Sequence, residues 1–222
     1  MTPHPECFSK ILHIVHKIIV INLKMCYNFA YKGLIAMYKR CVTEQSARRQ
    51  RELEAGLLAA MMAHQYEDIT ISDLCDSMKV PRKSFYRYFS SKDGALYALI
   101  DHTLSEFSGE FFSQEMTATI GTLERFFCFW RSHADFLDAL AKSSLSGILL
   151  QRSIMLVLEQ DLLSKRLLPF DKKSAQEYAI TFLISGLISL VVQWHRSSFK
   201  EDPHDLATIA AHLMTKQMIT TI

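Results

Sequence analysis

The chain has 222 residues, of which 49% are hydrophobic and 22% are charged, a composition typical of a globular protein with a sizeable core. Its formal net charge of +2 is too small for the whole molecule to bind a polyanion, so any affinity for nucleic acid must come from a local patch. Five scattered cysteines without a CxxC pair argue against a disulfide framework and for a reducing compartment, so we expect a cytoplasmic protein.

Residues 1–42 form an N-terminal extension whose composition differs from the rest. Its first 36 residues contain four lysines and one acid, and the apolar run at residues 11–23 is interrupted by two histidines and a lysine. Neither a secretory signal nor a membrane span is expected, because both need an unbroken apolar stretch. The HxxC and HxxH pairs in this segment lie too close together for a zinc-finger loop, so we expect no metal site.

The N-terminal extension also bears on where translation begins. Because the helical pattern begins only at Thr43, we expect translation to begin at or near Met37, which would leave residues 1–36 upstream of the true start. The alternative is a genuine basic arm, since such extensions before a DNA-binding helix can enter the minor groove. The mass of the native protein distinguishes the two.

Residues 44–64 are predicted to form one amphipathic helix. Arginines occupy its polar side, and apolar side chains recur at helical spacing on the other side. The inward positions are Leu53, Leu57, Ala60, Met61 and His64. From Thr43 onward no segment alternates like a strand, so the sequence predicts an all-α fold.

Two short helices joined by a tight turn are predicted next. Thr70 is expected to cap the first, about eight residues long, while Asp73 reaches back in a variant of the capping box. Lys79 and Val80 end this helix. Pro81 suits the first turn of the second helix, where a backbone N–H is not needed.

The second short helix lies within VPRKSFYRYFSSK, residues 80–92, a stretch with four cations, four aromatic rings and no carboxylate. Helical spacing puts Phe85 and Phe89, with Tyr88 beside them, on one face, which should pack. The opposite face carries Arg82, Lys83, Tyr86 and Arg87. A cationic face of this size fits the major groove of DNA, where arginine and lysine reach guanine edges and tyrosine reaches phosphates. A solvated basic face is the alternative.

The helix that follows begins at residues 90–92, with the sequence Ser-Ser-Lys. The free amides at its start, together with the charge of Lys92, would bind a phosphate.

Residues 45–105 resemble the DNA-binding domain of the tetracycline-repressor (TetR) family. The similarity rests on ITISDLCDSMKVPRKSFYRYFSSKDGALYALI, with an apolar-Thr-apolar entry at residues 69–71 and the spine Phe85-Tyr86-x-x-Phe89-x-x-Lys92. This resemblance implies a dimeric transcriptional regulator whose third helix enters the major groove of double-stranded operator DNA. It implies base or nearby backbone contacts for Arg82, Lys83, Ser84 and Arg87, phosphate contacts for Tyr86, Tyr88 and Lys92, and a contact with the neighbouring strand for Ser72.

Two positions depart from the family pattern. Lys79 stands where the family usually turns on glycine, so its backbone is expected to take a left-handed conformation at a cost of about 1 kcal/mol. Pro81 replaces the usual serine cap, which removes a side-chain acceptor. The docking angle and base preference are therefore expected to differ from those of the family.

The rest of the chain, residues 106–222, is predicted to be a helical domain for ligand binding and dimerisation. Helical patterns run over residues 92–115, 119–131, 133–142, 146–168, 172–198 and 204–219. Residues 179–192 are apolar all round, and we interpret them as a buried helix rather than a membrane span, because the uncharged stretch is short and contains polar residues. The resemblance implies a homodimer through residues 172–198 and 204–219.

Aromatic side chains gather between the two regions. The resemblance implies a ligand cavity there, and such rings could line one for an apolar or aromatic small-molecule effector. The candidate pocket residues are His102, Phe107, Phe126, Trp130 and His133. Ordinary core packing is the alternative for each of them. No cofactor is expected.

These observations predict a DNA-binding domain at residues 43–105 and a regulator, most simply a repressor, that a small-molecule effector releases from DNA. An enzyme is not expected, because the sequence lacks GxSxG, HExxH, GxxxxGK and GxGxxG motifs. The alternative function is an interaction or ligand-sensing module on the same scaffold that does not bind an operator.

Overall fold

The computed structural model describes residues 37–39, 41–112, 120–159 and 172–219, and every regular element in them is a helix, apart from one isolated β-bridge. The prediction of an all-α fold is confirmed. The helices are α2 (Glu44–Ala63), a 3-10 turn (Tyr66–Asp68), α3 (Ile71–Ser77), α4 (Arg82–Tyr86), α5 (Lys92–Phe112), α6 (Ile120–Ser132), α7 (Ala134–Lys142), α8 (Ser146–Glu159), α9 (Lys173–Arg196) and α10 (Pro203–Ile219). The rest of the predicted N-terminal extension, residues 1–36, lies outside the described residues.

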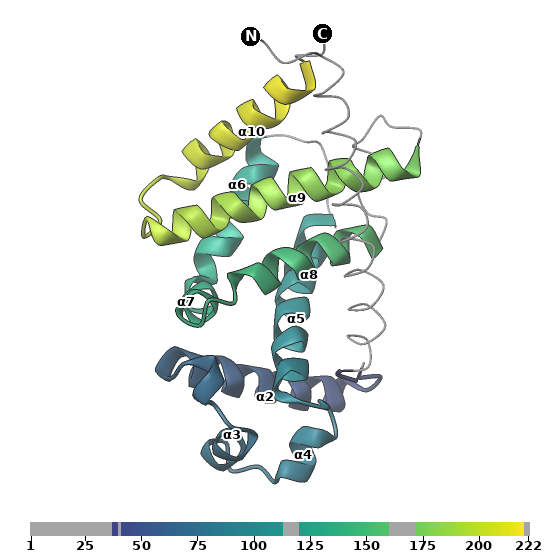
Figure 1. Cartoon of the computed structure of the whole chain (residues 1–222), viewed down its shortest axis with the longest axis vertical. Coiled ribbons are helices and arrows are strands. Elements are labelled where there is room, and N and C mark those ends of the chain that lie inside the picture. Colours follow the sequence, from purple (N-terminus) through teal and green to yellow (C-terminus); the bar gives the residue numbers. More distant parts are fainter. Residues whose placement is uncertain (1–36, 40, 113–119, 160–171, 220–222) are drawn as a thin grey trace, which may run out of the picture.

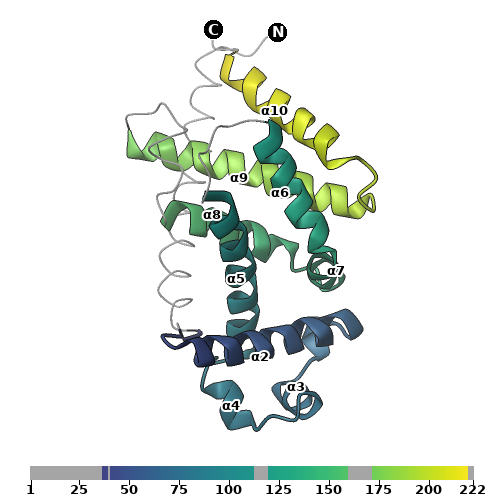
Figure 2. The same ribbon diagram turned by 180° about the vertical axis from the view of Figure 1, so that it is seen from behind.

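Helix α5 joins two groups of helices (Figure 1). At one end α2 lies across it, with α3 and α4 on the far side of α2, and at the other end lie α6, α8, α9 and α10. The view from behind shows the same arrangement (Figure 2). The predicted domain boundary after residue 105 falls inside α5, which continues to Phe112 without interruption.

The small end of the molecule has a dry core built from all of its helices. Leu57 and Met61 from α2, Leu74 from α3 and Phe85 from α4 are between 0% and 1% exposed. Burying an aliphatic or aromatic side chain of this size stabilises a fold by roughly 1.5–3 kcal/mol. The predicted apolar side of residues 44–64 is therefore confirmed for its central residues, whereas His64 is exposed.

Threonines cap the first two helices of this group. The Thr43 side chain accepts a hydrogen bond from the Ser46 amide, and the Thr70 side chain accepts one from the Asp73 amide at 3.1 Å. The Asp73 carboxylate reaches back as predicted, but it accepts from the Thr70 hydroxyl at 2.5 Å. Aspartate is one methylene shorter than the glutamate of the usual capping box, which explains this closer partner.

The turn between α3 and α4 has the left-handed residue that the sequence predicted. Lys79 has φ of 54°, and the next amide, that of Val80, donates to the Cys75 carbonyl at 2.9 Å. Pro81 precedes the helix instead of lying in its first turn, because its ψ of 141° is extended. It supplies no side-chain cap, as expected from its missing acceptor.

The helices of the large end follow the predicted ranges closely. Helices α6, α7, α9 and α10 each begin and end within two residues of the prediction. Pro203 is the first residue of α10, where its missing N–H costs nothing. The predicted ends of the helices that start at residues 92 and 146 fall in 113–119 and 160–171, outside the described residues.

Helix α9 is less buried in the single chain than the sequence predicted. It packs on α8, and its buried residues are Ile180, Ile188, Val191 and Trp194. Among the described residues it is long and apolar enough to cross a membrane, with 17% of its most apolar window buried. The interpretation of residues 179–192 as a core helix therefore holds for one side only.

The left-handed residue Lys79 gives a stability prediction. We expect Lys79→Gly to stabilise the fold by about 1 kcal/mol, because the left-handed conformation costs a residue with a Cβ roughly 1–2 kcal/mol and costs glycine almost nothing. For a chain of this size that is a rise in Tm of roughly 2–4 °C, measurable by thermal denaturation.

The matched control is Asp76→Gly, three residues earlier and inside α3. Here glycine should lower the stability by roughly 0.5–1 kcal/mol, because it only weakens the helix. A fall in Tm for both variants would contradict the strain assigned to Lys79.

Candidate nucleic-acid interface

Helix α4 presents one buried and one exposed face. Phe85 and Phe89 are 0% exposed, and their ring centroids lie 5.1 Å apart. On the opposite face Tyr86 is 54% exposed, and Arg82, Lys83 and Arg87 are also exposed. The two faces predicted from residues 80–92 are therefore present in the structure.

The cations of α4 are not neutralised by neighbouring acids. Within the described parts of the chain, neither Arg82, Lys83 nor Arg87 forms an ion pair with a carboxylate. The charge of Arg82 acts on Cys75 of α3, where it lowers the pKa of the thiol, although burial raises that pKa above its ordinary value. The α4 surface therefore carries its positive charge into solvent, available to an anionic partner.

A cleft of about 610 Å³ extends this surface toward α2. Its lining includes three cations, Arg49 from α2, Lys79 from the turn and Arg87 from the end of α4. The one acid of the lining, Glu52, is already paired with Arg49 at 3.2 Å. The cleft is lined by Arg49, Glu52, Leu53, Met78, Lys79, Val80, Pro81, Ser84, Arg87 and Tyr88.

The remaining predicted contact residues differ in exposure. Ser72 of α3 and Ser84 of α4 are half-buried, and Ser84 lines the cleft. Tyr88 is 9% exposed and packs beside Phe89, so its hydroxyl rather than its ring is what it would offer to a phosphate. These contacts stay predictions.

Lys92 has an additional role that its sequence position did not reveal. Its Nζ donates to the Ile69 carbonyl at 2.7 Å and to the Tyr66 carbonyl, and it lies 4.2 Å from the centroid of the Tyr66 ring. The ammonium therefore holds the 3-10 turn before α3 against the start of α5. Its predicted phosphate contact stays a prediction.

A second contact fixes the same junction. The Tyr66 hydroxyl donates to the Asp93 carboxylate at 2.6 Å. Burial, and then this hydrogen bond, raise the pKa of Tyr66 far above its ordinary value, so the hydroxyl stays a donor at any physiological pH. Because Asp93 follows Lys92, two adjacent side chains of α5 tie down the segment that leads into α3 and α4.

Comparison with known proteins identifies the type of protein. Residues 117–216 match the TetR-family model described as a transcriptional regulator C-terminal region. Residues 117–216 therefore have the sequence of the C-terminal region of a TetR-family transcriptional regulator. The match covers the large end, whereas the resemblance of residues 45–105 concerned the small end.

Solved structures of TetR-family regulators are similar in fold. The fatty acid degradation regulator FadR from Bacillus halodurans is 16% identical, with a TM-score of 0.52 over 73% of this chain and 96% of that one. A regulator from Streptomyces coelicolor and the repressor AlkX from Dietzia sp. are 16% and 20% identical, with TM-scores of 0.48 and 0.49. They cover 75% of this chain and 78% and 95% of their own. No curated protein sequence matches the chain.

Four of the five candidate pocket residues come together between α5 and α6. The Phe107 ring lies 5.3 Å from that of Phe126, and His133 stacks on Phe129 at 4.1 Å. Trp130 is 0% exposed, and its indole nitrogen has no hydrogen-bond partner among the described residues.

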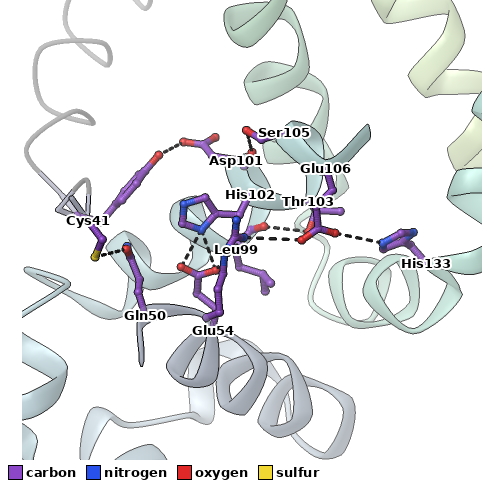
Figure 3. Close-up of polar contacts among 12 residues, drawn as sticks. Cys41, Gln50, Glu54, Leu99, Asp101, His102, Thr103, Ser105, Glu106 and His133 are labelled. Carbon is purple, nitrogen blue, oxygen red and sulfur yellow. Dashed lines mark hydrogen bonds and ion pairs between the residues drawn. The ribbon is translucent and has the colours of Figure 1, made fainter. Parts of the chain in front are cut away.

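The fifth candidate, His102, faces the small end of the molecule. Its Nδ1 lies 2.9 Å from both carboxylate oxygens of Glu54, a residue of α2 that is 2% exposed (Figure 3). The described residues contain no group of three or more side chains that could hold a metal ion.

The two lysines of the candidate interface should differ in how much each contributes to the stability of the fold. Because the Lys92 ammonium is bonded to buried carbonyls, we expect Lys92→Met to lower the free energy of unfolding by roughly 1.5–3 kcal/mol. Lys83 is exposed and has no such bonds in the described structure, so Lys83→Met should stay within about 0.5 kcal/mol of the parent. Urea denaturation measures both, and equal midpoints for the two variants would contradict the structural role of Lys92.

Proposed function

We propose that this regulator is a homodimeric repressor that binds operator DNA through α4 and is released by a small-molecule effector. The observation that carries the proposal is the exposed cationic face of α4, which is free of neighbouring carboxylates while its other face is locked into the core. DNA binding is assigned to residues 43–105, and effector binding and dimerisation to residues 106–222. Helix α5 is continuous through the boundary.

The proposed contacts are those that the family resemblance implies. Arg82 and Lys83, at the start of α4, would reach base edges in the major groove, with Ser84 and Arg87 on bases or the nearby backbone. Tyr86, Tyr88 and Lys92 would hold phosphates on either side. Ser72 on α3 would contact the neighbouring strand.

The first test is fluorescence anisotropy of the full chain on DNA from its own upstream region, across a salt series. We expect tight binding that weakens steeply with salt, because each neutralised phosphate contributes about −0.9 to the slope of log K against log salt. Arg82→Ala should cost roughly 1–3 kcal/mol and relax base preference. Tyr86→Phe should weaken binding by roughly 0.5–1.5 kcal/mol, because it removes one phosphate hydrogen bond.

The control for charge alone is Arg131→Ala, an exposed arginine of α6 on the large end. It should leave affinity and salt slope unchanged. If the parent chain does not bind the DNA at all, the alternative function, an interaction or ligand-sensing module without operator binding, is the better one.

Exposed apolar side chains on the last two helices support a homodimer. Tyr178 and Phe182 of α9 are 38% and 61% exposed, and Ile209 and Leu213 of α10 are 47% and 49% exposed. Each pair is spaced by four residues, so each forms a stripe on one helix face. In the single chain these helices pack through their other sides, α9 on α8 and α10 on α6. A second copy in two-fold symmetry would cover both stripes.

If the apolar stripe on α9 lies in a dimer interface, a charged residue placed there should prevent dimerisation. We expect Phe182→Glu to convert a particle of two chains into a monomer of 25.5 kDa, because the new carboxylate would be buried unpaired at the interface. Light scattering after gel filtration measures the mass. Met62→Glu, on a 40% exposed methionine of α2, is the control that should remain dimeric. An unchanged mass for Phe182→Glu would place the interface elsewhere.

The aromatic cluster of α5 and α6 supports an apolar or aromatic effector. Phe107, Phe126, Trp130 and His133 would face it, and the indole N–H of Trp130 is a buried donor that a polar atom of the effector would satisfy. His102 would act at the α2 end of α5 rather than in the same pocket.

Release would follow from the position of α5, which contacts both ends of the molecule. An effector that favours one tilt of α5 changes the separation of the two recognition helices, and half-sites about 34–36 Å apart tolerate little change. A nearly complete switch needs a roughly 10⁴-fold preference of the effector for the released state. An effector-bound dimer with unchanged spacing of its recognition helices would rule this mechanism out.

A further inference from the structure

Residues 37–39, here called the N-terminal strap, pair with the end of the recognition helix. Tyr38 forms an antiparallel bridge with Phe89, in which the Lys39 amide donates to the Tyr88 carbonyl at 2.8 Å and the Ser90 amide donates to the Met37 carbonyl at 2.9 Å. The Ser90 hydroxyl donates to the same carbonyl at 3.0 Å. The strap is therefore bonded to the segment that joins α4 to α5.

Close packing against α5 holds the strap from a second side. A Cβ added at Gly94 would lie 2.2 Å from the Met37 carbonyl oxygen, much closer than any real contact. The first turn of α5 therefore accepts the strap only because residue 94 is glycine.

The side chain of Tyr38 extends from the strap and contacts the buried ion pair of Asp101 and Arg152. Its hydroxyl donates to Asp101 Oδ2 at 2.5 Å, and the Asp101 side chain, on α5, is 8% exposed. Arg152 of α8, whose side chain is 12% exposed, donates through Nε to Asp101 Oδ1 at 2.6 Å and through its second nitrogen to Oδ2. One carboxylate is thus shared by the strap and by α8, and Figure 3 shows it on α5 beside His102.

Because the Asp101 carboxylate is buried, its contacts with Arg152 and with the Tyr38 hydroxyl are energetically coupled. If α8 drew Arg152 away, the Asp101 carboxylate would be left buried without its counter-charge, which is strongly unfavourable. If the Tyr38 hydroxyl left, one of the oxygens would lose a charge-assisted hydrogen bond. A displacement of α8 is therefore transmitted to Asp101 and then to the strap, rather than absorbed at the ion pair.

The strap also has an anchor on α2, beyond its own residues. Cys41 Sγ donates to Gln50 Oε1 at 2.9 Å, and Gln50 is 2% exposed. Burial raises the pKa of the Cys41 thiol, which keeps it a donor. Cys41, just before α2, is thus held close to the core.

We propose that Tyr38 is a positioning residue for DNA recognition, because it couples α8, through Asp101, to the end of the recognition helix α4. The route runs from Arg152 to Asp101, to the Tyr38 hydroxyl, and along the strap to Phe89 and Ser90. Its consequence for DNA rests on the proposed function, whereas the coupling itself does not.

The coupling is tested by amide hydrogen exchange on the full chain without DNA. The reporters are the Lys39 and Ser90 amides, which form the bridge between the strap and the segment that joins α4 to α5. We expect Tyr38→Phe to speed their exchange about tenfold, because it removes one hydrogen bond to a charged group. Arg152→Met should speed the same two amides although it lies on α8, and the double variant should add little to the larger single effect.

The control is Asp138→Ala, which removes a pair that links two other helices, His195 Nε2 to Asp138 Oδ1 at 2.7 Å between α9 and α7. It should leave the Lys39 and Ser90 amides unchanged. Exchange within twofold of the parent in Tyr38→Phe overturns the proposal, as does an Arg152→Met variant that affects only amides near α8. If Arg152→Met does not fold, Arg152→Lys, which keeps the charge but loses the two-point contact, takes its place with the same criteria.

DNA anisotropy with the same variants tests the consequence. Tyr38→Phe should bind about threefold to tenfold more weakly with an unchanged salt slope, because no phosphate contact is lost. Faster exchange with unchanged affinity would overturn the positioning role. If the parent chain does not bind DNA, the proposed function fails while the exchange experiment still decides whether the coupling exists.

Discussion

A helix of five residues cannot persist alone in water, because its nucleation is unfavourable and it forms too few internal hydrogen bonds to compensate. Helix α4 spans only Arg82–Tyr86, so its conformation depends on the burial of Phe85 and, just beyond it, Phe89. Everything that fixes these two rings also orients the cations on the opposite face. The core of the small end is therefore the part of the structure on which the proposed DNA recognition depends.

Polar contacts then set where that small core sits relative to the rest. Lys92 and Asp93 fasten the turn before α3 to α5, and Glu54, buried on α2, meets His102 further along α5. Glu54 is buried and Lys92 is half-buried, so losing a partner of either charge is costly, whereas Asp93 is exposed. Helix α5 thereby carries two sets of ties, toward α2 and α3 at one end and toward α8 at Asp101.

The sequence predicted the helices well and their long-range contacts poorly. Helix limits follow from local periodicity and capping, so α3 could be predicted from neighbouring residues. The left-handed Lys79 was predicted from the family resemblance, because it stands where the family usually has glycine. The partner of Lys92 lies in a turn 26 residues away, and Tyr38 and Asp101 are 63 residues apart. No periodic pattern encodes such pairs, because they depend on how the helices cross. Pro81 was misplaced by one residue because proline fixes φ and leaves ψ open.

The glycine positions differ in how strongly the fold restricts substitution by other residues. Position 94 is closed to every side chain by a backbone oxygen, whereas a Cβ at Gly147 would meet no described residue within 4 Å. Gly186 on α9 is equally open in one chain, but it lies on a helix whose other surface is proposed to meet a second copy. Natural variation should therefore be absent at residue 94 and free at residue 147. At residue 186 it would follow the partner's surface, so that the two copies can change there only together.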